Sequence, residues 1–196
     1  MGIFTGKRVV LVGPAPHIVD RVQDLSGYDL VCRVGLRPPL SDEIKKCTSD
    51  RFDVWFPANQ LLRLYPKMCL ADELKIIRTS QKCTGLIPLS ARNKISYINT
   101  DTSKLRKDVE CCPNRGLKAM IDILSEDPAE LYVTGLTFYL DGAYYNGYSS
   151  DKDNAEHTKK RGNIGNHKQE PQIEYFKKYI MPHIKMDWKL KELFSA

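Results

Sequence analysis

The sequence predicts an α/β fold, built as a single Rossmann-like domain over residues 1–196 with a mostly parallel sheet. The first observation is a continuous β-branched and aliphatic run at residues 8–12, which is typical of a strand buried on both faces of a parallel sheet. The second is that this run and a later one, residues 130–134, both end at a glycine. Open α/β sheets place their ligand crevice at the carboxyl ends of the strands, so we expect both glycines at that edge.

The N-terminal 35 residues form the first predicted βαβ unit. Pro14 and Pro16 make a turn after the first strand, and the apolar spacing over residues 18–25 predicts a helix that ends at Gly27. Residues 28–34 then form a second predicted strand. A strand, a helix and a second strand in this order predict a right-handed crossover.

The rest of the chain is less regular until a second ordered unit begins at Asn114. A helix over residues 117–124, capped by Asn114, leads to the strand at residues 130–134. We expect residues 139–166, which are rich in Tyr, Gly, Asn, Asp and Lys, to form a mobile loop or lid over the crevice. The remaining predicted elements are short strands at residues 52–56, 74–78 and 95–98, a helical turn at 60–65, a loop at 79–93, and helices at 171–180 and 183–194.

Composition narrows the class of protein. The net charge of +6 suits a phosphate-bearing small molecule or weak nucleic-acid contact, and it selects neither. No apolar run approaches the roughly 20 residues that cross a bilayer, and the N-terminus lacks the features of a signal peptide, so we expect a soluble, cytoplasmic protein with no transmembrane segment. The six cysteines include no CxxC pair. We expect them to be reduced thiols, and we expect no metal site.

Two turns are candidates for binding a nucleotide phosphate. A helix N-terminus offers free N–H groups and a partial positive charge, which attract an anion. The first turn is neither GxGxxG nor GxxxxGK[ST], which argues against dinucleotide binding and against a P-loop. Ordinary tight turns without a ligand remain the alternative. The candidate residues of the two turns are Gly13, Pro14, Ala15, Asn114, Arg115 and Gly116.

His167 is the candidate general base. A histidine titrates near neutral pH and can accept the proton of a hydroxyl nucleophile, although a surface histidine that caps a helix remains the alternative. His17, in the first turn, could contact a phosphate or face solvent. In the Tyr-rich loop, Tyr145 and Tyr148 are candidates for substrate or lid contacts, because tyrosines stack on bases and sugars; simple packing is the alternative.

Three segments resemble the motifs of the sialyltransferase family, of the eukaryotic and viral type. Their order and spacing agree with those of the family from residue 7 to residue 174. The segments are Lys7–His17 with Gly27–Gly35 for the long motif, Cys112–Leu124 with Leu131–Leu136 for the short motif, and Asn166 and His167 with Glu170 and Glu174 for the terminal motif.

The resemblance implies a GT-A variant-2-like fold and a metal-independent enzyme without a bound cofactor. A CMP-sugar would be the donor co-substrate, and a hydroxyl-bearing molecule the acceptor. The nucleotide would lie on the first turn and the short motif, which adds Gly135 and Leu136 to the candidate residues. His167 would be the base of a direct inverting transfer, and Glu170 joins the substrate or lid group.

Two other classes of function stay open. A non-catalytic viral or phage module on the same fold would bind a nucleotide, RNA or a protein partner; Pro14 and Arg115 motivate it, because the family has other residues there. A Rossmann-like methyltransferase is a third reading. It would need an acidic ribose-binding residue after the second strand, where Val34–Arg37 stand instead.

Overall fold

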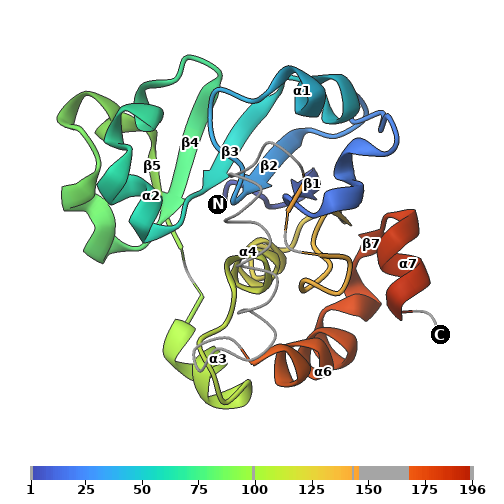
Figure 1. Cartoon of the computed structure of the whole chain (residues 1–196). Coiled ribbons are helices and arrows are strands. Elements are labelled where there is room, and N and C mark those ends of the chain that lie inside the picture. The colour runs from blue at the N-terminus through green and yellow to red at the C-terminus, as the bar shows by residue number, and fades with distance from the viewer. Residues whose placement is uncertain (1, 99, 143, 146–167, 195–196) are drawn as a thin grey trace.

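All strands of the described structure pair in parallel in one seven-stranded sheet, with the order β5-β4-β3-β2-β1-β6-β7. The computed structural model describes residues 2–98, 100–142, 144–145 and 168–194 (Figure 1). The predicted α/β fold with a parallel sheet is therefore confirmed. The strands are β1 (Arg8–Val12), β2 (Leu30–Val34), β3 (Phe52–Phe56), β4 (Leu74–Thr79), β5 (Ile95–Tyr97), β6 (Glu130–Thr134) and β7 (Lys185–Met186).

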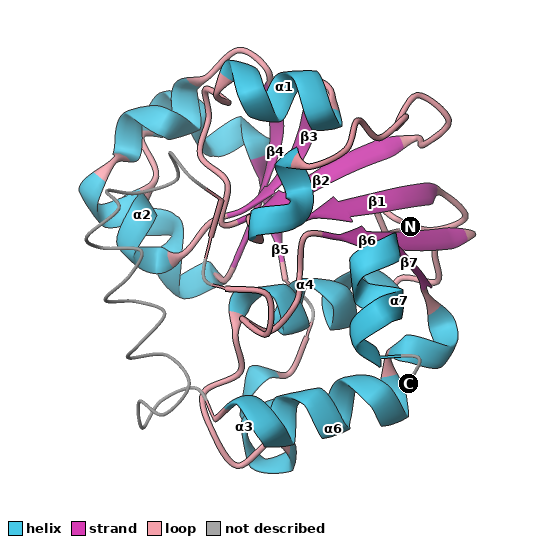
Figure 2. Ribbon diagram, turned by 45° about the vertical axis from the view of Figure 1, so that its right-hand side comes forward, coloured by secondary structure: helices cyan, strands magenta, loops and turns pink. Residues whose placement is uncertain are grey.

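Helices cover both faces of the sheet (Figure 2). The side chains of α1 and α2 join one core cluster, and those of α3, α4, α6 and α7 join another on the opposite face. None of the helices in the described residues is both long and apolar enough to cross a membrane. The α-helices are α1 (Asp42–Thr48), α2 (Asn59–Leu64), α3 (Thr102–Asp108), α4 (Arg115–Leu124), α6 (Gln169–Tyr179) and α7 (Trp188–Phe194). The 3-10 helices are η1 (Pro16–Val19), η2 (Pro66–Leu70), η3 (Gln81–Leu86), η4 (Leu89–Lys94) and η5 (Met181–His183).

Side chains of strand β1 enter the cores on both faces of the sheet. Val9 and Leu11 belong to the cluster with α4, whereas Val10 and Val12 belong to the cluster with α1. All four side chains are fully buried. Because successive side chains of a strand point to opposite faces, only an uninterrupted apolar run can fill both cores, as the sequence predicted.

The chain changes direction across the sheet between β1 and β6. It runs outward from β1 to β5 and then returns to add β6 on the other side of β1. The glycines that follow these two strands lie against each other: the N–H of Gly13 donates to the carbonyl of Thr134 (2.8 Å), and that of Ala15 to the carbonyl of Gly135 (3.0 Å). A Cβ on Gly13 would lie 2.3 Å from the Gly135 oxygen, so the two turns meet this closely only without side chains.

The predicted helix over residues 18–25 is wrong. Only the single 3-10 turn η1 forms, and the chain then extends along the end of α1, where the N–H of Gln23 donates to the carbonyl of Cys47 (2.8 Å). Val22, which the helical pattern required to be buried, is 71% exposed. Contacts with α1 therefore override the local apolar spacing.

Other elements were predicted in part or missed. The predicted tail helix over residues 183–194 is α-helical only from Trp188, because Lys185 and Met186 extend the sheet as β7. Helices α1 and α3 were not predicted, although Ser41 and Asp101 cap their N-termini. The expected loop at residues 79–93 contains η3 and part of η4.

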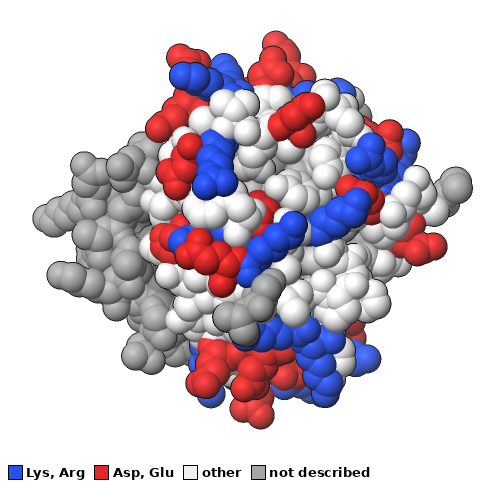
Figure 3. All heavy atoms as spheres, turned by 90° about the vertical axis from the view of Figure 1, so that its right-hand side faces the viewer, with Lys and Arg blue, Asp and Glu red and all other residues white. Residues whose placement is uncertain are grey.

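The cysteines are mostly buried, and the charges on one face of the molecule are mixed in sign. No disulfide joins cysteines within the described residues; five of the six are buried, and Cys112 is half-buried. On the face that carries β7 and α7, basic and acidic side chains alternate (Figure 3). The positive net charge therefore does not gather into a basic patch on that face.

Candidate functional site

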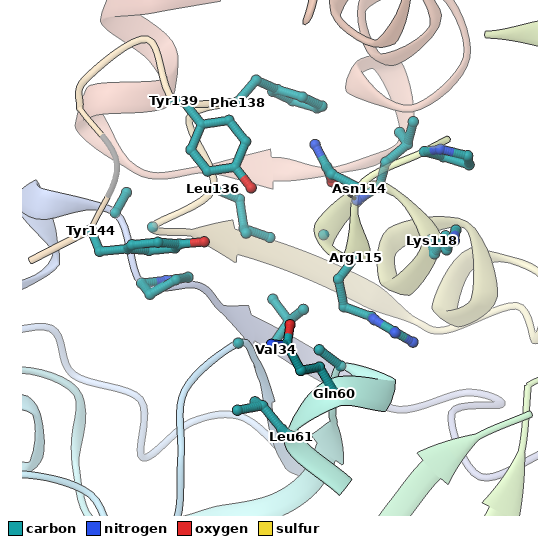
Figure 4. Close-up of a pocket in the computed structure, with 18 of the residues that line it drawn as sticks. Val34, Gln60, Leu61, Asn114, Arg115, Lys118, Leu136, Phe138, Tyr139 and Tyr144 are labelled. Atoms are coloured by element: carbon teal, nitrogen blue, oxygen red, sulfur yellow. Dashed lines mark hydrogen bonds between the residues drawn. The ribbon is translucent and has the colours of Figure 1, made fainter. Parts of the chain in front are cut away.

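A cavity of about 670 Å³ opens at the carboxyl edge of the sheet, beside the point where the chain changes direction (Figure 4). Its walls come from the turns after β1, β2 and β6, from α2, and from the N-terminal turns of α4. This is where open α/β sheets bind ligands, and the volume is within the usual range for small-molecule sites.

The charged side chains that line the cavity in the described structure are all positive. Arg37, Arg115 and Lys118 line it, and no aspartate or glutamate lies among the lining residues that the structure describes. Cationic walls in a partly enclosed space raise the local concentration of anions. The cavity is therefore suited to a negatively charged ligand.

The N-terminus of α4 is held firmly in this wall. The side chain of Asn114 accepts a hydrogen bond from the N–H of Leu117 (2.8 Å), so the predicted cap is present. The N–H of Asn114 donates to Oε1 of the buried Gln172 on α6 (2.7 Å). The first N–H groups of any α-helix have no acceptor within the helix, and here Arg115 and Gly116, the first two residues of α4, line the cavity. These N–H groups add a partial positive charge to that of the side chains.

Arg115 and Lys118 stand on successive turns of α4. Nη2 of Arg115 donates to Oδ1 of Asn59 (3.2 Å), which links α4 to α2. Burial lowers the pKa of Arg115, and it also lowers the pKa of Lys118, where the neighbouring cations Arg115 and Arg106 act in the same direction. Within the part of the chain that the structure describes, neither side chain forms an ion pair, and a bound anion would supply a countercharge for both.

Tyrosines form the wall on the other side. Tyr139 and Tyr144 both line the cavity, with their rings edge to face at 6.2 Å, and Tyr144 enters opposite Arg115 (Figure 4). The backbone of Phe138 and Tyr139 is left-handed, with φ of 53° and 66°. This strained turn buries Phe138 against Phe176 (5.1 Å) and directs Tyr139 into the cavity.

The structure brings most of the predicted nucleotide-binding residues to this cavity. Gly13 is the exception: it packs against Gly135 and the side chain of Leu136, so its missing side chain makes room for protein rather than for a ligand. The candidates that line the cavity are Pro14, Ala15, Asn114, Arg115, Gly116, Gly135 and Leu136.

The other candidates lie elsewhere. Tyr145 is buried in the core with α1, and its N–H donates to the carbonyl of Pro14 (3.0 Å). Glu170 is exposed in the first turn of α6 and does not line the cavity. His167 and Tyr148 lie outside the described residues, and so does most of the predicted loop at 139–166.

Sequence reasoning missed the wall formed by α2 and by Arg37. Asn59, Gln60 and Leu61 line the cavity because α2 follows β3 at the carboxyl edge. The helical turn itself was predicted, but its place beside α4 depends on the strand order. Arg37 follows β2 at the same edge, and that position was the available signal.

His17 neither reaches the cavity nor faces solvent, which corrects both expectations for it. It is 2% exposed and lies behind the first turn, between two carboxylates. Nε2 is 2.8 Å from Oδ2 of Asp187, and Nδ1 is 3.1 Å from Oδ2 of Asp141.

Comparison with known proteins shows likeness at the level of fold. No protein-family model matches the chain, and no curated protein matches it. A structure of the sialyltransferase CstII from Campylobacter jejuni, in complex with the substrate analogue CMP-3FNeuAc, has a TM-score of 0.53 at 14% identity, over 94% of this chain and 88% of that chain. A variant of sialyltransferase CST-II in complex with CMP has a TM-score of 0.50 at 14% identity, with the same coverage.

These similarities confirm the predicted sialyltransferase-like fold. They are to a bacterial enzyme, and they do not support the eukaryotic or viral type that the motifs suggested. At this identity the likeness concerns the fold alone, so the chemistry has to be argued from the residues of the cavity.

Proposed function

We propose that this chain is a glycosyltransferase that binds a CMP-sugar in the cavity and transfers the sugar to an acceptor hydroxyl. The proposal rests on the three cationic side chains of the cavity wall, Arg37, Arg115 and Lys118, and on the N-terminus of α4 beside them. A nucleoside monophosphate ester would place its phosphate against the N–H groups of Arg115 and Gly116. The two similar sialyltransferase structures are complexes with a CMP-sugar analogue and with CMP, which supports the choice of nucleotide.

The main chemical demand of the proposed reaction is to stabilise the CMP leaving group. As the acceptor oxygen bonds to the anomeric carbon, the bond from that carbon to the phosphate oxygen breaks, and negative charge builds up on the departing CMP. Arg115, Lys118 and the α4 N-terminus would stabilise this charge in place. Such catalysis needs positioning and fixed dipoles, and we propose that it proceeds without a metal ion and with inversion at the anomeric carbon.

His167 is the proposed base that takes the acceptor proton, on the strength of the sequence motif. Tyr139 and Tyr144 would hold the donor from the side opposite α4, since a phenol ring packs on a sugar or base and its hydroxyl can donate to a phosphate. Tyr148 and Glu170 remain proposed substrate contacts.

Calorimetry with CMP, UDP, GDP, S-adenosylmethionine and a short RNA tests the proposal. We expect CMP to bind selectively, and CMP-sugars then to be turned over. His167→Ala should abolish turnover and leave CMP binding intact. Salt-sensitive RNA binding without a response to CMP would instead support the non-catalytic module.

Arg115→Gln isolates the cationic wall. We expect CMP affinity to fall on the order of tenfold, because one charge-assisted contact is lost. Arg92→Gln is the matched control: Arg92 is exposed on η4 and does not line the cavity. If both variants bind CMP as the unmodified chain does, Arg115 does not hold the phosphate.

A further inference from the structure

His17 contacts two carboxylates that are held very differently. Oδ2 of Asp187 also accepts hydrogen bonds from Oγ1 of Thr134 (2.7 Å) and from the N–H of Gly135 (3.0 Å). Its Oδ1 accepts from the N–H of Leu190 (2.8 Å), at the start of α7. Asp187 is therefore fixed whether or not His17 is present.

Asp141 has much weaker support. Its side chain is 22% exposed, and its other charged contact within the described residues is Nζ of Lys189, 3.7 Å from Oδ1. It lies between two anchored residues, Phe138 in the core and Tyr145, which bonds to the turn after β1. The contact with Nδ1 of His17 joins the middle of this segment to the protein.

The charge of His17 decides how many of these contacts can form. An imidazolium donates from both ring nitrogens and satisfies both carboxylates, whereas a neutral imidazole has one N–H and one lone pair. The shorter contact and the firmly held acceptor favour keeping the N–H on Nε2, toward Asp187. The lone pair on Nδ1 then faces the carboxylate of Asp141 and repels it.

The segment around Asp141 also carries residues of the cavity wall. Tyr139 precedes Asp141 by two positions and Tyr144 follows it by three, and both line the cavity. We propose that the contact between His17 and Asp141 is a proton-dependent latch, which positions the two tyrosines when His17 is charged and releases them when it is neutral. His17 is thus a positioning residue, and the effect of the latch on ligand affinity rests on the proposed function of the cavity.

The surroundings of His17 extend the pH range over which it is charged. Burial alone would lower its pKa, but Asp187 and Asp141 outweigh burial and raise the pKa above the ordinary value of 6.5. The other charged or titratable groups nearby are Lys189 on α7, Arg21, whose guanidinium lies 4.3 Å from the ring of Trp188, and Tyr132 on β6, whose pKa burial and Asp187 raise to about 12. The latch is therefore closed at pH values below the raised pKa of His17 and opens as pH rises through it.

Asp141→Asn is the variant that tests the latch. An asparagine amide can accept from a charged His17 and donate to a neutral one, so it keeps the contact in both states. Hydrogen exchange, corrected for the intrinsic rate at each pH, is followed at two hydrogen-bonded amides, Leu140 to Thr137 and Tyr145 to Pro14. From about pH 5.5 to about pH 8.5, we expect exchange to rise on the order of tenfold in the unmodified chain and to stay level in the variant. Equal pH dependence in both chains, or none in either, would overturn the latch.

CMP affinity is then compared in the same two chains over the same pH range. The ligand phosphate titrates identically for both, so the ratio of the two affinities reports the latch alone. We expect the unmodified chain to lose on the order of tenfold relative to Asp141→Asn as pH rises. A constant ratio would overturn the link between the latch and the cavity. Failure of both chains to bind CMP at any pH would overturn the proposed function, while the exchange experiment would still decide the latch.

Discussion

Two buried ionic clusters in the described structure differ in the residue that carries the positive charge. In one, Arg78 on β4 binds two carboxylates of α4: Nε lies 2.6 Å from Oδ2 of Asp122, and Nη2 bonds to Glu126. In the other, His17 lies between Asp187 and Asp141. Both cations are almost fully buried, Arg78 at 3% and His17 at 2% exposure.

The difference lies in which charge can be withdrawn. A guanidinium stays charged at any pH that a folded protein meets, so the arginine cluster fastens β4 to α4 permanently. An imidazole loses its charge near neutrality. The permanent cation joins β4 to α4, the helix whose N-terminal residues line the cavity. The titratable one supports the segment that carries Tyr139 and Tyr144.

Removing the permanent cation should have the largest effect. We expect Arg78→Met to lower the free energy of unfolding by about 3–5 kcal/mol, because two buried carboxylates lose the guanidinium that balances their charge. Urea denaturation measures the loss. Buried carboxylates without a cation bind protons more readily, so the deficit should narrow toward acid pH.

Arg78→Lys is the control that keeps the positive charge and removes the shape of the guanidinium. A lysine carries its donors on one nitrogen, whereas Arg78 reaches Asp122, Ser96 and Glu126 from three separate nitrogens. Its stability should fall between those of the unmodified chain and Arg78→Met. A loss below about 1 kcal/mol for the methionine variant would mean that the cluster does not fasten α4.

Removing the titratable cation should have a smaller effect with the opposite pH trend. The pKa of His17 is raised in the folded chain, so its contribution is fully present below the unfolded value of 6.5 and is lost as pH rises through the folded pKa. We expect His17→Gln to cost about 2 kcal/mol at about pH 5.5. The deficit should shrink toward alkaline pH, whereas that of Arg78→Met should grow.

Urea denaturation of both variants at three pH values, acid, neutral and alkaline, checks the crossing trends. A deficit for His17→Gln that is the same at all three would show that His17 does not change charge in this range. A deficit that grows with pH would show that His17 is neutral in the fold, and the comparison of the two clusters would then be wrong.

The parts of this arrangement that the sequence predicted are local. The run at residues 8–12 has one environment that suits it, a strand with a core on each face, and β1 has it. Asn114 caps α4 through its own side chain, three residues from its donor. Glycines directly after two strands were enough to place the cavity edge.

The parts that could not be predicted depend on distant residues. His17 and Asp187 are 170 positions apart and meet because β7 adds to β6 and places the start of α7 beside the first turn. Nothing in the short apolar pattern of residues 18–25 reports this contact or the one between Gln23 and Cys47 that replaces the predicted helix. The α2 wall likewise follows from the strand order.

An ion pair on the surface should contribute much less to stability than the two buried clusters do. Nζ of Lys185 lies 2.6 Å from Oε2 of Glu130, the same separation as between Arg78 and Asp122, but the lysine side chain is 67% exposed. Water and salt screen such a pair. We therefore expect Lys185→Ala to lower the free energy of unfolding by about 0.5 kcal/mol or less, and the loss to vanish at high salt in denaturation experiments. A loss as large as that of Arg78→Met would mean that distance governs these energies. A small, salt-sensitive loss would show that burial does, which is why the two buried clusters can fix α4 and the tyrosine segment while the alternating charges of the β7 face (Figure 3) contribute little.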